Sequence, residues 1–358
     1  MFDVLIIGGG VAGLSLASQL APHVSVALIE AEPSLGYHAS GRSAAAYEPN
    51  YGLPSTLELT RASFEAHKAS GVLSPRGCLL LAKAADKDAF LDDVKTLDLH
   101  QISIKDAKAK VPIIDDTKVA FAAHHDGLWD LDTDLLLQSF TKIARSHGAE
   151  IICGQKVTSI GRSPRGWSVE SQSRTTEAKV LINAAGAWAD GIARMAGVPP
   201  IGLQPLRRSM GRIPAPGGHD VSGWPMFFGP SESWYAKPDA GALIVSPADE
   251  DPTEPHDAFA DDIVLAEGFA RYEEHVTEPV TRLLSSWAGL RTFAPDRQFV
   301  LGRDPSDPSF IWCAGQGGYG FQSCHGAAQY LAEVVLEKPS SFSATLHQQL
   351  DPARFNAS

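Results

Sequence analysis

Residues 2–13 read FDVLIIGGGVAG, a short apolar run that ends in closely spaced glycines. Phe2 to Ile7 are typical of a strand that is buried on both faces. Gly8, Gly10 and Gly13 fit the pattern G-x-G-x-x-G: the first glycine permits a tight turn and the second lets the backbone approach a pyrophosphate. The third allows a helix to pack closely on the strand. This stretch predicts the strand-to-helix turn of a dinucleotide-binding fold.

The residues that follow complete a strand–helix–strand unit. Apolar residues continue at helical spacing as far as Leu20, and a second short strand is expected from Val24 to Ile29. That strand ends in Glu30, about 20 residues beyond the glycines, where an acid would bind ribose hydroxyls. The free N–H groups and positive dipole at the start of the helix would hold the phosphates. If these glycines were only turn residues, a second strand ending in an acid would not be expected at this distance from them.

The sequence favours FAD over a nicotinamide cofactor. The glycine motif has no second copy, and the small-residue loop GYHASGRSAAA at 36–46 follows at once. Small residues and backbone amides suit close packing against a flat ring system such as a flavin. Two more small-residue turns, at 183–188 and 315–320, follow apolar strands. The helix expected after the second turn would direct its positive amino end at an electron-rich group.

Composition excludes several classes of protein. The chain has 358 residues and a net charge of −12 without any Lys/Arg-rich run, so a nucleic-acid partner is not expected. The four cysteines lie far apart with no C-x-x-C pair, which argues against a zinc site or disulfides. Apolar runs stay below the roughly 18 residues of a membrane span, and the strand at Met1 leaves no room for a signal peptide. We expect a cytoplasmic protein with no metal and no integral membrane segment.

Periodicity gives a coarse outline of the remaining chain. A strand is expected at Gly77–Ala82, a helix around Leu135–Ala144, and a second, aromatic-rich sheet between about 206 and 287. Four further strands are expected between this helix and the second sheet. We expect the second to fourth to form a hairpin excursion, after which the chain returns to the sheet at 179–182. These strands are Ala149–Cys153, Val157–Ile160, Trp167–Glu170 and Thr175–Ala178.

Seven segments spread along the chain resemble the D-amino-acid oxidase-like flavoproteins, and within them the D-arginine dehydrogenases. They are VLIIGGGVAGLSLA (4–17), GYHASGRSAA (36–45), VLINAAGAWAD (180–190), GLQPLRRS (202–209), WYAKPDAGAL (234–243), WAGLRTF (287–293) and AGQGGYGFQS (314–323). The resemblance implies an α/β fold with a discontinuous Rossmann-type FAD-binding domain and a mixed β-sheet substrate domain. The expected boundaries are 1–70, 134–201 and 289–358 for the first domain, and 71–133 and 202–288 for the second.

The resemblance also implies which residues contact FAD. The loop after Gly41 would lie against the flavin, and the turn at 316–320 beside its pyrimidine end, where the helix dipole favours the anionic reduced ring. The expected cofactor residues are Gly8, Gly10, Val11, Ala12, Gly13, Glu30, Ala31, Gly41, Arg42, Ser43, Ala44, Ala45, Val157, Ala184, Gly186, Trp188, Gly315, Gly317, Gly318, Tyr319, Gly320 and Phe321.

Two arginines are candidates for binding a substrate carboxylate. Arg208 and Arg291 lie in apolar or aromatic surroundings, and two guanidiniums together offer fork-shaped donors to a carboxylate. The resemblance places both at carboxylate-binding positions; structural salt bridges are the alternative. Arg207 should point to the opposite face of its strand.

Other substrate contacts come from the resemblance alone. It implies that Tyr235 contacts the substrate carboxylate and that Tyr51 lines the lid of the active site. Either tyrosine could instead be a core aromatic residue. It assigns the backbone carbonyl of Gly318 to the substrate amine, and Met226 and Phe228 to the apolar pocket wall.

Three positions depart from the D-arginine dehydrogenase pattern. Cys78 stands where the relative has an acid that pairs with the substrate guanidinium, Ala46 where it has a histidine, and Glu48 where it has a small hydroxyl residue. Because a buried unpaired charge is costly, we expect a substrate with a neutral or apolar side chain. Glu48 keeps a cationic side chain open as the alternative.

The activity implied is removal of hydride from Cα of a D-amino acid to flavin N5, giving an imino acid that hydrolyses to a 2-oxo acid and ammonia. The electron acceptor could be oxygen, a quinone or another molecule. Oxidation of secondary amines of the sarcosine or glycine type, oxidation of 2-hydroxy acids, and a non-catalytic scaffold remain alternatives. His38 lies in the cofactor loop, where some relatives bind FAD covalently, whereas His124 and His125 are expected to be surface or structural residues.

Overall fold

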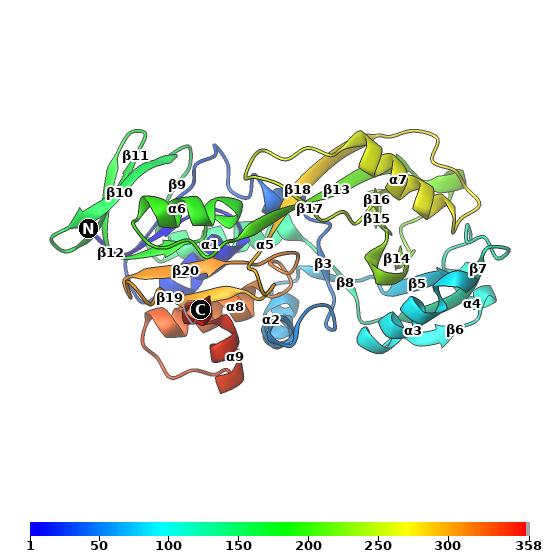
Figure 1. Cartoon of the computed structure of the whole chain (residues 1–358), viewed down its shortest axis with the longest axis horizontal. Coiled ribbons are helices and arrows are strands. Elements are labelled where there is room, and N and C mark those ends of the chain that lie inside the picture. Colours follow the sequence, from blue (N-terminus) through cyan, green and yellow to red (C-terminus); the bar gives the residue numbers. More distant parts are fainter. Residues whose placement is uncertain (356–358) are drawn as a thin grey trace.

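The computed structural model describes residues 1–355 and contains two large sheets side by side along the long axis (Figure 1). The first has the order β10-β11-β12-β1-β2-β9, and β20 joins β12 to β19. Its strands are β1 (Phe2–Ile7), β2 (Val26–Ile29), β9 (Glu150–Ile152), β10 (Val157–Ser163), β11 (Gly166–Ser171), β12 (Thr175–Asn183), β19 (Val300–Arg303) and β20 (Phe310–Ala314). The first strand and the last described residues, 352–355, both lie at this sheet (Figure 1).

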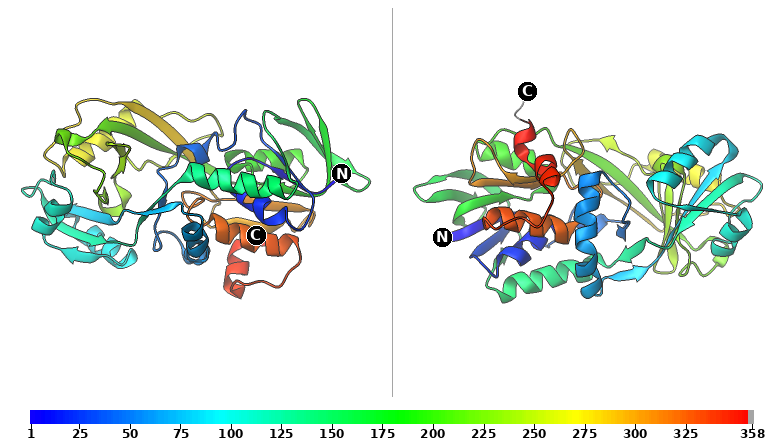
Figure 2. Two further views of the ribbon diagram at one scale, coloured as in Figure 1. Left: turned by 180° about the vertical axis from the view of Figure 1, so that it is seen from behind. Right: turned by 90° about the horizontal axis from the view of Figure 1, so that it is seen from below.

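Alternate residues of β1 face two different cores, as the period of a strand requires. Val4 and Ile6 pack with the helices on one face, and Leu5 and Ile7 with α6 on the other. The helices of the first sheet are α1 (Val11–Leu20), α2 (Pro54–Ala69), α5 (Thr133–Ser146), α6 (Ala189–Met195), α8 (Cys324–Val335) and α9 (Ala344–Leu350). Figure 2 shows α2 standing beside α8 near the middle of the molecule.

Parallel pairing brings four cofactor-facing turns to one edge of this sheet. β1 pairs in parallel with β2 and β12, with Ile7 opposite Ile29 and Asn183, and β20 runs parallel to β12. The carboxyl ends of these strands therefore meet, and the turns that follow them emerge together. This is where ligands bind in open α/β sheets.

The expected break between strands at 175–178 and 179–182 is wrong. One strand, β12, runs from Thr175 to Asn183. Its first half pairs antiparallel with β11 and its second half parallel with β1, so β10 and β11 extend the same sheet and make no separate excursion. A change of partner along one strand leaves no trace in hydrophobic periodicity.

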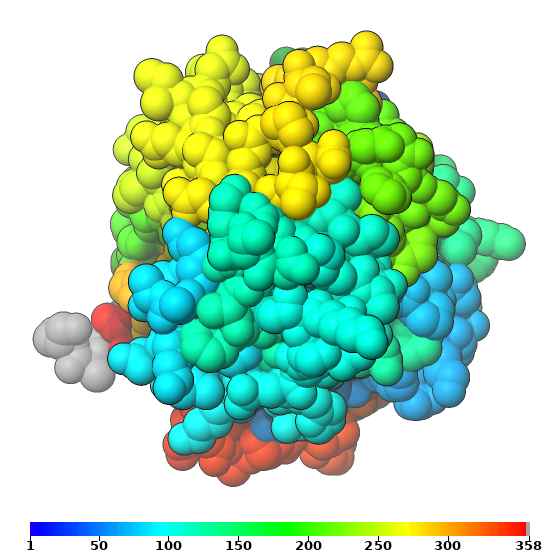
Figure 3. Space-filling view, turned by 90° about the vertical axis from the view of Figure 1, so that its right-hand side faces the viewer, coloured from blue at the N-terminus to red at the C-terminus, as the bar shows by residue number. Residues whose placement is uncertain are grey.

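The second sheet has the order β17-β13-β16-β15-β14-β5-β7-β6, with β18 paired to β13. Figure 3 shows the end of the molecule that it forms. Its strands are β5 (Cys78–Lys83), β6 (His100–Ile102), β7 (Val119–His125), β13 (Gln204–Pro214), β14 (Met226–Phe228), β15 (Tyr235–Asp239), β16 (Ala242–Ser246), β17 (Asp251–Pro252) and β18 (Ser285–Phe293), with helices α3 (Lys87–Thr96), α4 (Ile104–Lys110) and α7 (Asp262–Glu273).

A small third sheet links the two large ones. It has the order β3-β8-β4, from β3 (Ala46–Tyr47), β4 (Leu73–Pro75) and β8 (Trp129–Leu131). The domain boundaries stay a prediction, and β18 crosses the one expected at 288/289, since all of it pairs with β13. Within residues 1–355, no helix combines the length and the apolar character needed to cross a membrane.

Candidate active site

A cavity of about 400 Å³ is lined by residues of both large sheets and of the loop that contains Arg42. One wall comes from the start of α1, the 39–46 loop and the turns after β12 and β20; the other comes from β5, β13, β14, β15 and β18. The structure brings ten predicted substrate-side residues to this one cavity. They are Arg208, Arg291, Tyr235, Tyr51, Gly318, Ala46, Glu48, Cys78, Met226 and Phe228.

The predicted cofactor residues divide into two groups. Those in the cavity wall are Gly10, Val11, Ala12, Arg42, Ser43, Ala44, Ala45, Ala184, Gly186, Gly317, Gly318, Gly320 and Phe321. Those outside it are Gly8, Gly13, Glu30, Ala31, Gly41, Val157, Trp188, Gly315 and Tyr319. Val157 is buried in the core on the α6 face of the first sheet, and its contact with FAD stays a prediction.

The glycine turn fits a bound dinucleotide. A Cβ on Gly8 would lie 2.3 Å from the carbonyl oxygen of Ala184, and one on Gly13 would lie 2.0 Å from the carbonyl oxygen of Gly8. Gly10 caps α1 without a side chain, and no acid stands in the first turn, so the positive end of α1 faces the cavity. This is the arrangement that binds phosphate groups. Glu30 accepts hydrogen bonds from Gly9 N at 2.6 Å and Glu32 N at 2.8 Å, beside this turn.

His38 points away from the cavity wall. Its Nε2 lies 2.9 Å from a carboxylate oxygen of Glu32, and its ring centroid lies 4.5 Å from that of Trp188. Arg42 extends from the same loop to the carbonyl oxygens of Ala258 and Ala288 and to the carboxylate of Asp257. The loop is therefore fixed by its charged side chains, while its small residues face the cavity.

Strand register explains why the two candidate arginines meet. β13 and β18 are antiparallel, with Leu206 opposite Arg291 and Arg208 opposite Gly289, so both arginines lie on the face that lines the cavity. Arg207 lies on the other face, where its Nη2 donates to Asp251 at 2.6 Å. Arg208 is only 6% exposed.

Each candidate arginine is held in place by fixed partners. Arg291 Nη2 donates to Tyr51 Oη at 2.9 Å, and Nη1 donates to Glu250 Oε1 at 3.1 Å. Arg208 Nε donates to the carbonyl oxygen of Asp249 at 2.9 Å, and Arg208 Nη2 lies 3.4 Å from Glu250 Oε1. Glu250 also pairs with Arg297 at 3.0 Å. A second carboxylate, that of Glu232, lies 3.8 Å from Arg208 Nη2. Because two carboxylates cannot neutralise three guanidiniums, the cluster keeps positive charge for a further anion.

The side chain of Arg291 leaves no room for a Cβ at position 318. A Cβ there would lie 1.7 Å from Nη2 of Arg291. Burial raises the pKa of Tyr51 well above its ordinary value, so its hydroxyl remains a neutral donor. Burial likewise raises the pKa of the Cys78 thiol.

Several residues of the site carried no recognisable signal in the sequence. Gln322 lines the cavity, and its side chain bonds the segment opposite: Glu48 N donates to its Oε1 at 3.3 Å, and its Nε2 donates to the carbonyl oxygen of Tyr51 at 3.0 Å. Glu250 and Gln322 lie far in sequence from the residues they hold. Only the distance between atoms in the folded chain reveals them.

Three acidic residues line the cavity: Asp93 on α3, Glu232 after β14, and Glu48, which is 7% exposed. His125, which the sequence analysis grouped with scattered surface or structural histidines, places Nε2 3.0 Å from Glu48 Oε2, although the two atoms lack hydrogen-bond geometry. Gly127 N donates to His125 Nδ1 at 2.8 Å.

Comparison with known proteins agrees with this geometry. The model of the family "FAD dependent oxidoreductase" (DAO) matches residues 3–334. The bovine "FAD-dependent oxidoreductase domain-containing protein 1" is 25% identical over 94% of this chain and 81% of its own length. N-methyl-L-tryptophan oxidase of Salmonella arizonae is 23% identical over 78% of this chain and 77% of its own. L-proline dehydrogenase from P. horikoshii, of known structure, shares the fold with a TM-score of 0.85 and 20% identity, covering 99% of this chain and 97% of its own. The chain belongs to the DAO family of FAD-dependent oxidoreductases, and its cofactor is FAD.

Proposed function

We propose that the protein oxidises a D-amino acid at Cα, with the substrate carboxylate bound by Arg208 and Arg291. The observation that carries this proposal is the position of the two guanidiniums, on the same face of the paired strands β13 and β18, in a cavity shared with the dinucleotide turn. The assignment of the D configuration rests on the resemblance to D-arginine dehydrogenase alone.

The residues of the site act mainly by orienting the substrate. Bound FAD supplies the ring that accepts hydride. The guanidiniums of Arg208 and Arg291 and the hydroxyl of Tyr51 fix the carboxylate, and the carbonyl oxygen of Gly318 accepts a hydrogen bond from the amine. A substrate held at its carboxylate and its amine presents Cα in one fixed direction. The entropy cost of aligning it is then met on binding and does not add to the barrier of the chemical step. The imino acid released then hydrolyses in water to a 2-oxo acid and ammonia.

The cavity wall favours an amine over a 2-hydroxy acid. Oxidation of a hydroxyl requires a base to take its proton, usually a histidine. No histidine lines the cavity within residues 1–355. A neutral amine needs no such base, since its nitrogen lone pair assists the loss of hydride.

The position of Glu48 favours a basic side chain. The expectation of a neutral side chain rested on Cys78 replacing an acid, but Glu48 stands close to Cys78, their ligand atoms lying within 4.8 Å of each other. We therefore propose that the preferred substrate is basic, the alternative that Glu48 kept open.

A secondary amine is the second candidate. Two similar proteins bear the names of substrates with a secondary α-amine, N-methyl-L-tryptophan and L-proline. Arginine binding of the carboxylate would serve such substrates equally well. Such substrates differ from primary amino acids at the amine, which carries an additional carbon substituent. The amine is the group that we assign to the carbonyl of Gly318.

Anaerobic bleaching of the flavin separates these candidates. The holoenzyme is mixed with D-lysine, D-leucine, L-lysine, L-proline, N-methylglycine and a 2-hydroxy acid, and the rate of bleaching is compared. Fastest reduction by D-lysine supports the proposal, and reduction only by proline or N-methylglycine moves the enzyme to the second candidate. Admitting air afterwards shows whether oxygen is the electron acceptor.

A further inference from the structure

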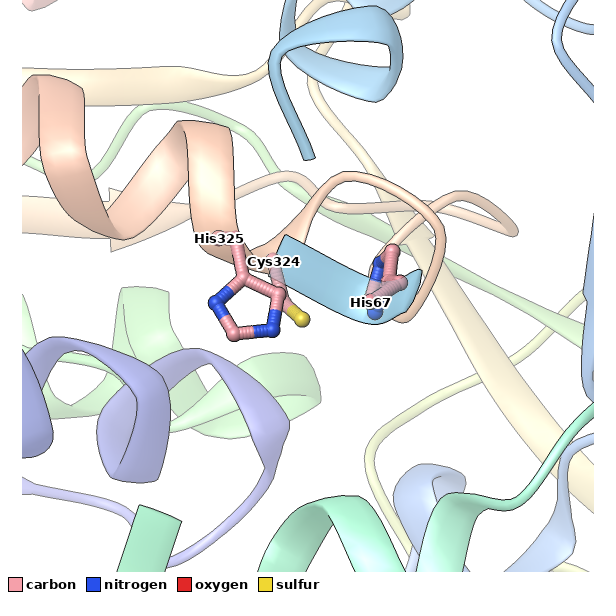
Figure 4. A group of neighbouring side chains, drawn as sticks. All are labelled: His67, Cys324 and His325. Atoms are coloured by element: carbon pink, nitrogen blue, oxygen red, sulfur yellow. The ribbon is translucent and has the colours of Figure 1, made fainter. Parts of the chain in front are cut away.

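A second cluster of chemically active side chains lies outside the cavity, where the end of α2 meets the start of α8. His67 comes from the last turn of α2, and Cys324 and His325 are the first two residues of α8 (Figure 4). Their ligand atoms all lie within 4.8 Å of one another. Cys324 and His325 are adjacent in sequence, and the packing of α2 against α8 brings His67 to them.

Two nitrogen atoms of this cluster have no hydrogen-bond partner. His67 is fully buried, and its Nε2 lies 3.2 Å from the carbonyl oxygen of Gln322. A carbonyl only accepts, so Nε2 carries the proton and Nδ1 holds a free lone pair. Nδ1 of His67 and Nε2 of His325 are both buried and unpaired. Leaving such groups unsatisfied costs about 1–3 kcal/mol each.

Packing between aromatic rings explains why flat side chains stand at these positions. It does not explain why those side chains are histidines, which have ring nitrogens. The rings of His67 and His325 meet edge to face with centroids 4.8 Å apart, and Phe140 packs on His325 at 5.0 Å. An aromatic residue would pack as well without the unpaired nitrogens. A ligand that accepts both lone pairs and the Cys324 sulfur satisfies all three groups.

The donor set and its surroundings select the ligand. Two imidazole nitrogens and one thiolate suit Cu⁺ or Zn²⁺. Structural zinc sites have four protein ligands, and within residues 1–355 this group has three. No acid stands in the first turn of α8, whose amino end is already positive. Cu⁺ with one thiolate is neutral, whereas Zn²⁺ would leave a buried positive charge there.

We propose that His67, Cys324 and His325 bind one Cu⁺ ion in a three-coordinate site. The Cys324 thiol releases its proton to water as the copper–sulfur bond forms, and no electron is transferred. The carbonyl of Gln322 orients His67 from behind, as is usual for imidazoles that bind metals.

Competition for Cu⁺ tests the site in the holoenzyme. Under anaerobic conditions Cu⁺ is added with a chromophoric chelator that absorbs outside the flavin bands, and copper retained by the protein is counted. We expect the wild-type protein to withhold one equivalent and Cys324→Ala to withhold none. Cys313→Ala is the matched control, because Cys313 is also buried but outside this cluster. Equal retention by wild type and Cys324→Ala, or no retention by wild type, overturns the proposal.

A second variant guards against loss of folding. His325→Phe keeps an aromatic ring against Phe140 and removes Nε2. Flavin content and thermal unfolding show that each variant is folded, and X-ray absorption of the copper-loaded wild type should show sulfur and nitrogen ligands. Folded His325→Phe that still withholds copper as tightly as wild type contradicts the three-coordinate site.

Discussion

At the scale of single residues, Arg291 is the most constrained side chain of the cavity. Tyr51 and Glu250 hold its two terminal nitrogens, and the absence of a side chain at Gly318 leaves room for it. The apolar surroundings of Arg291 made it a candidate from the sequence, and the resemblance to known flavoproteins led to Tyr51 and Gly318. Neither led to Glu250, because no pattern in the chain joins position 250 to position 291.

Replacement of Arg291 by alanine should raise KM and lower kcat/KM by at least about tenfold. A hydrogen bond to a charged group contributes about 1.5–3 kcal/mol, and about 1.4 kcal/mol corresponds to tenfold. Steady-state kinetics measure this effect. Arg212→Ala is the control, since Arg212 lies on β13 but pairs with Asp239 outside the cavity. Near-wild-type kinetics of Arg291→Ala would remove this residue from carboxylate binding.

Replacement of Glu48 by glutamine should raise KM for D-lysine and leave KM for D-leucine near the wild-type value. The amide keeps the shape of the carboxylate and removes its charge, so only a cationic side chain loses attraction. The ratio of kcat/KM for the two substrates is the measurement. An equal change for both would mean that Glu48 only supports the fold of the 46–51 segment.

At the scale of secondary structure, the local sequence pattern predicted those helices and strands that pack mainly against segments near them in sequence. The strand Phe2–Ile7, the glycine turn and the helix after it followed from apolar runs and backbone geometry. β12 did not, because its two halves pair with different strands. Gln322 was missed for a similar reason: its partners Glu48 and Tyr51 lie more than 270 residues away.

Gly8→Ala should weaken FAD binding by at least about tenfold. The residue has φ +115°, and the new Cβ would meet the Ala184 carbonyl, so strain of about 1–3 kcal/mol falls on the turn. Flavin retained after gel filtration measures the loss. Gly191→Ala is the matched control in α6, where nothing lies within 4 Å of the new Cβ and helix propensity improves. Equal flavin content in both variants would refute the role of Gly8.

At the scale of the whole molecule, buried histidines link stability to pH. Burial lowers the pKa of His67 and of His325 from 6.5 to about 4, and that of His275 in the same direction. The unfolded chain therefore binds more protons than the folded one between these values. Stability is fully present above about pH 6.5 and is lost as pH falls toward 4.

Urea unfolding of the metal-free protein should accordingly show a lower free energy of unfolding at pH 5 than at pH 7. His325→Phe should flatten this dependence, because one of the groups that take up protons on unfolding is gone. A chelator in the buffer keeps Cu⁺ from masking the effect. An unchanged pH slope in a folded His325→Phe protein would show that His325 is not a source of acid sensitivity.

The pairing of β12 with both β1 and β20 has a consequence for biosynthesis. The glycine turn leaves the ribosome long before β20 and α8, whose turn completes the cavity wall. Until then the nascent chain holds an unfinished sheet with exposed apolar edges, a state prone to aggregation and bound by chaperones. Flavin loading must therefore follow the emergence of β20 and α8, and ribosomes stalled before residue 310 should carry chains without flavin.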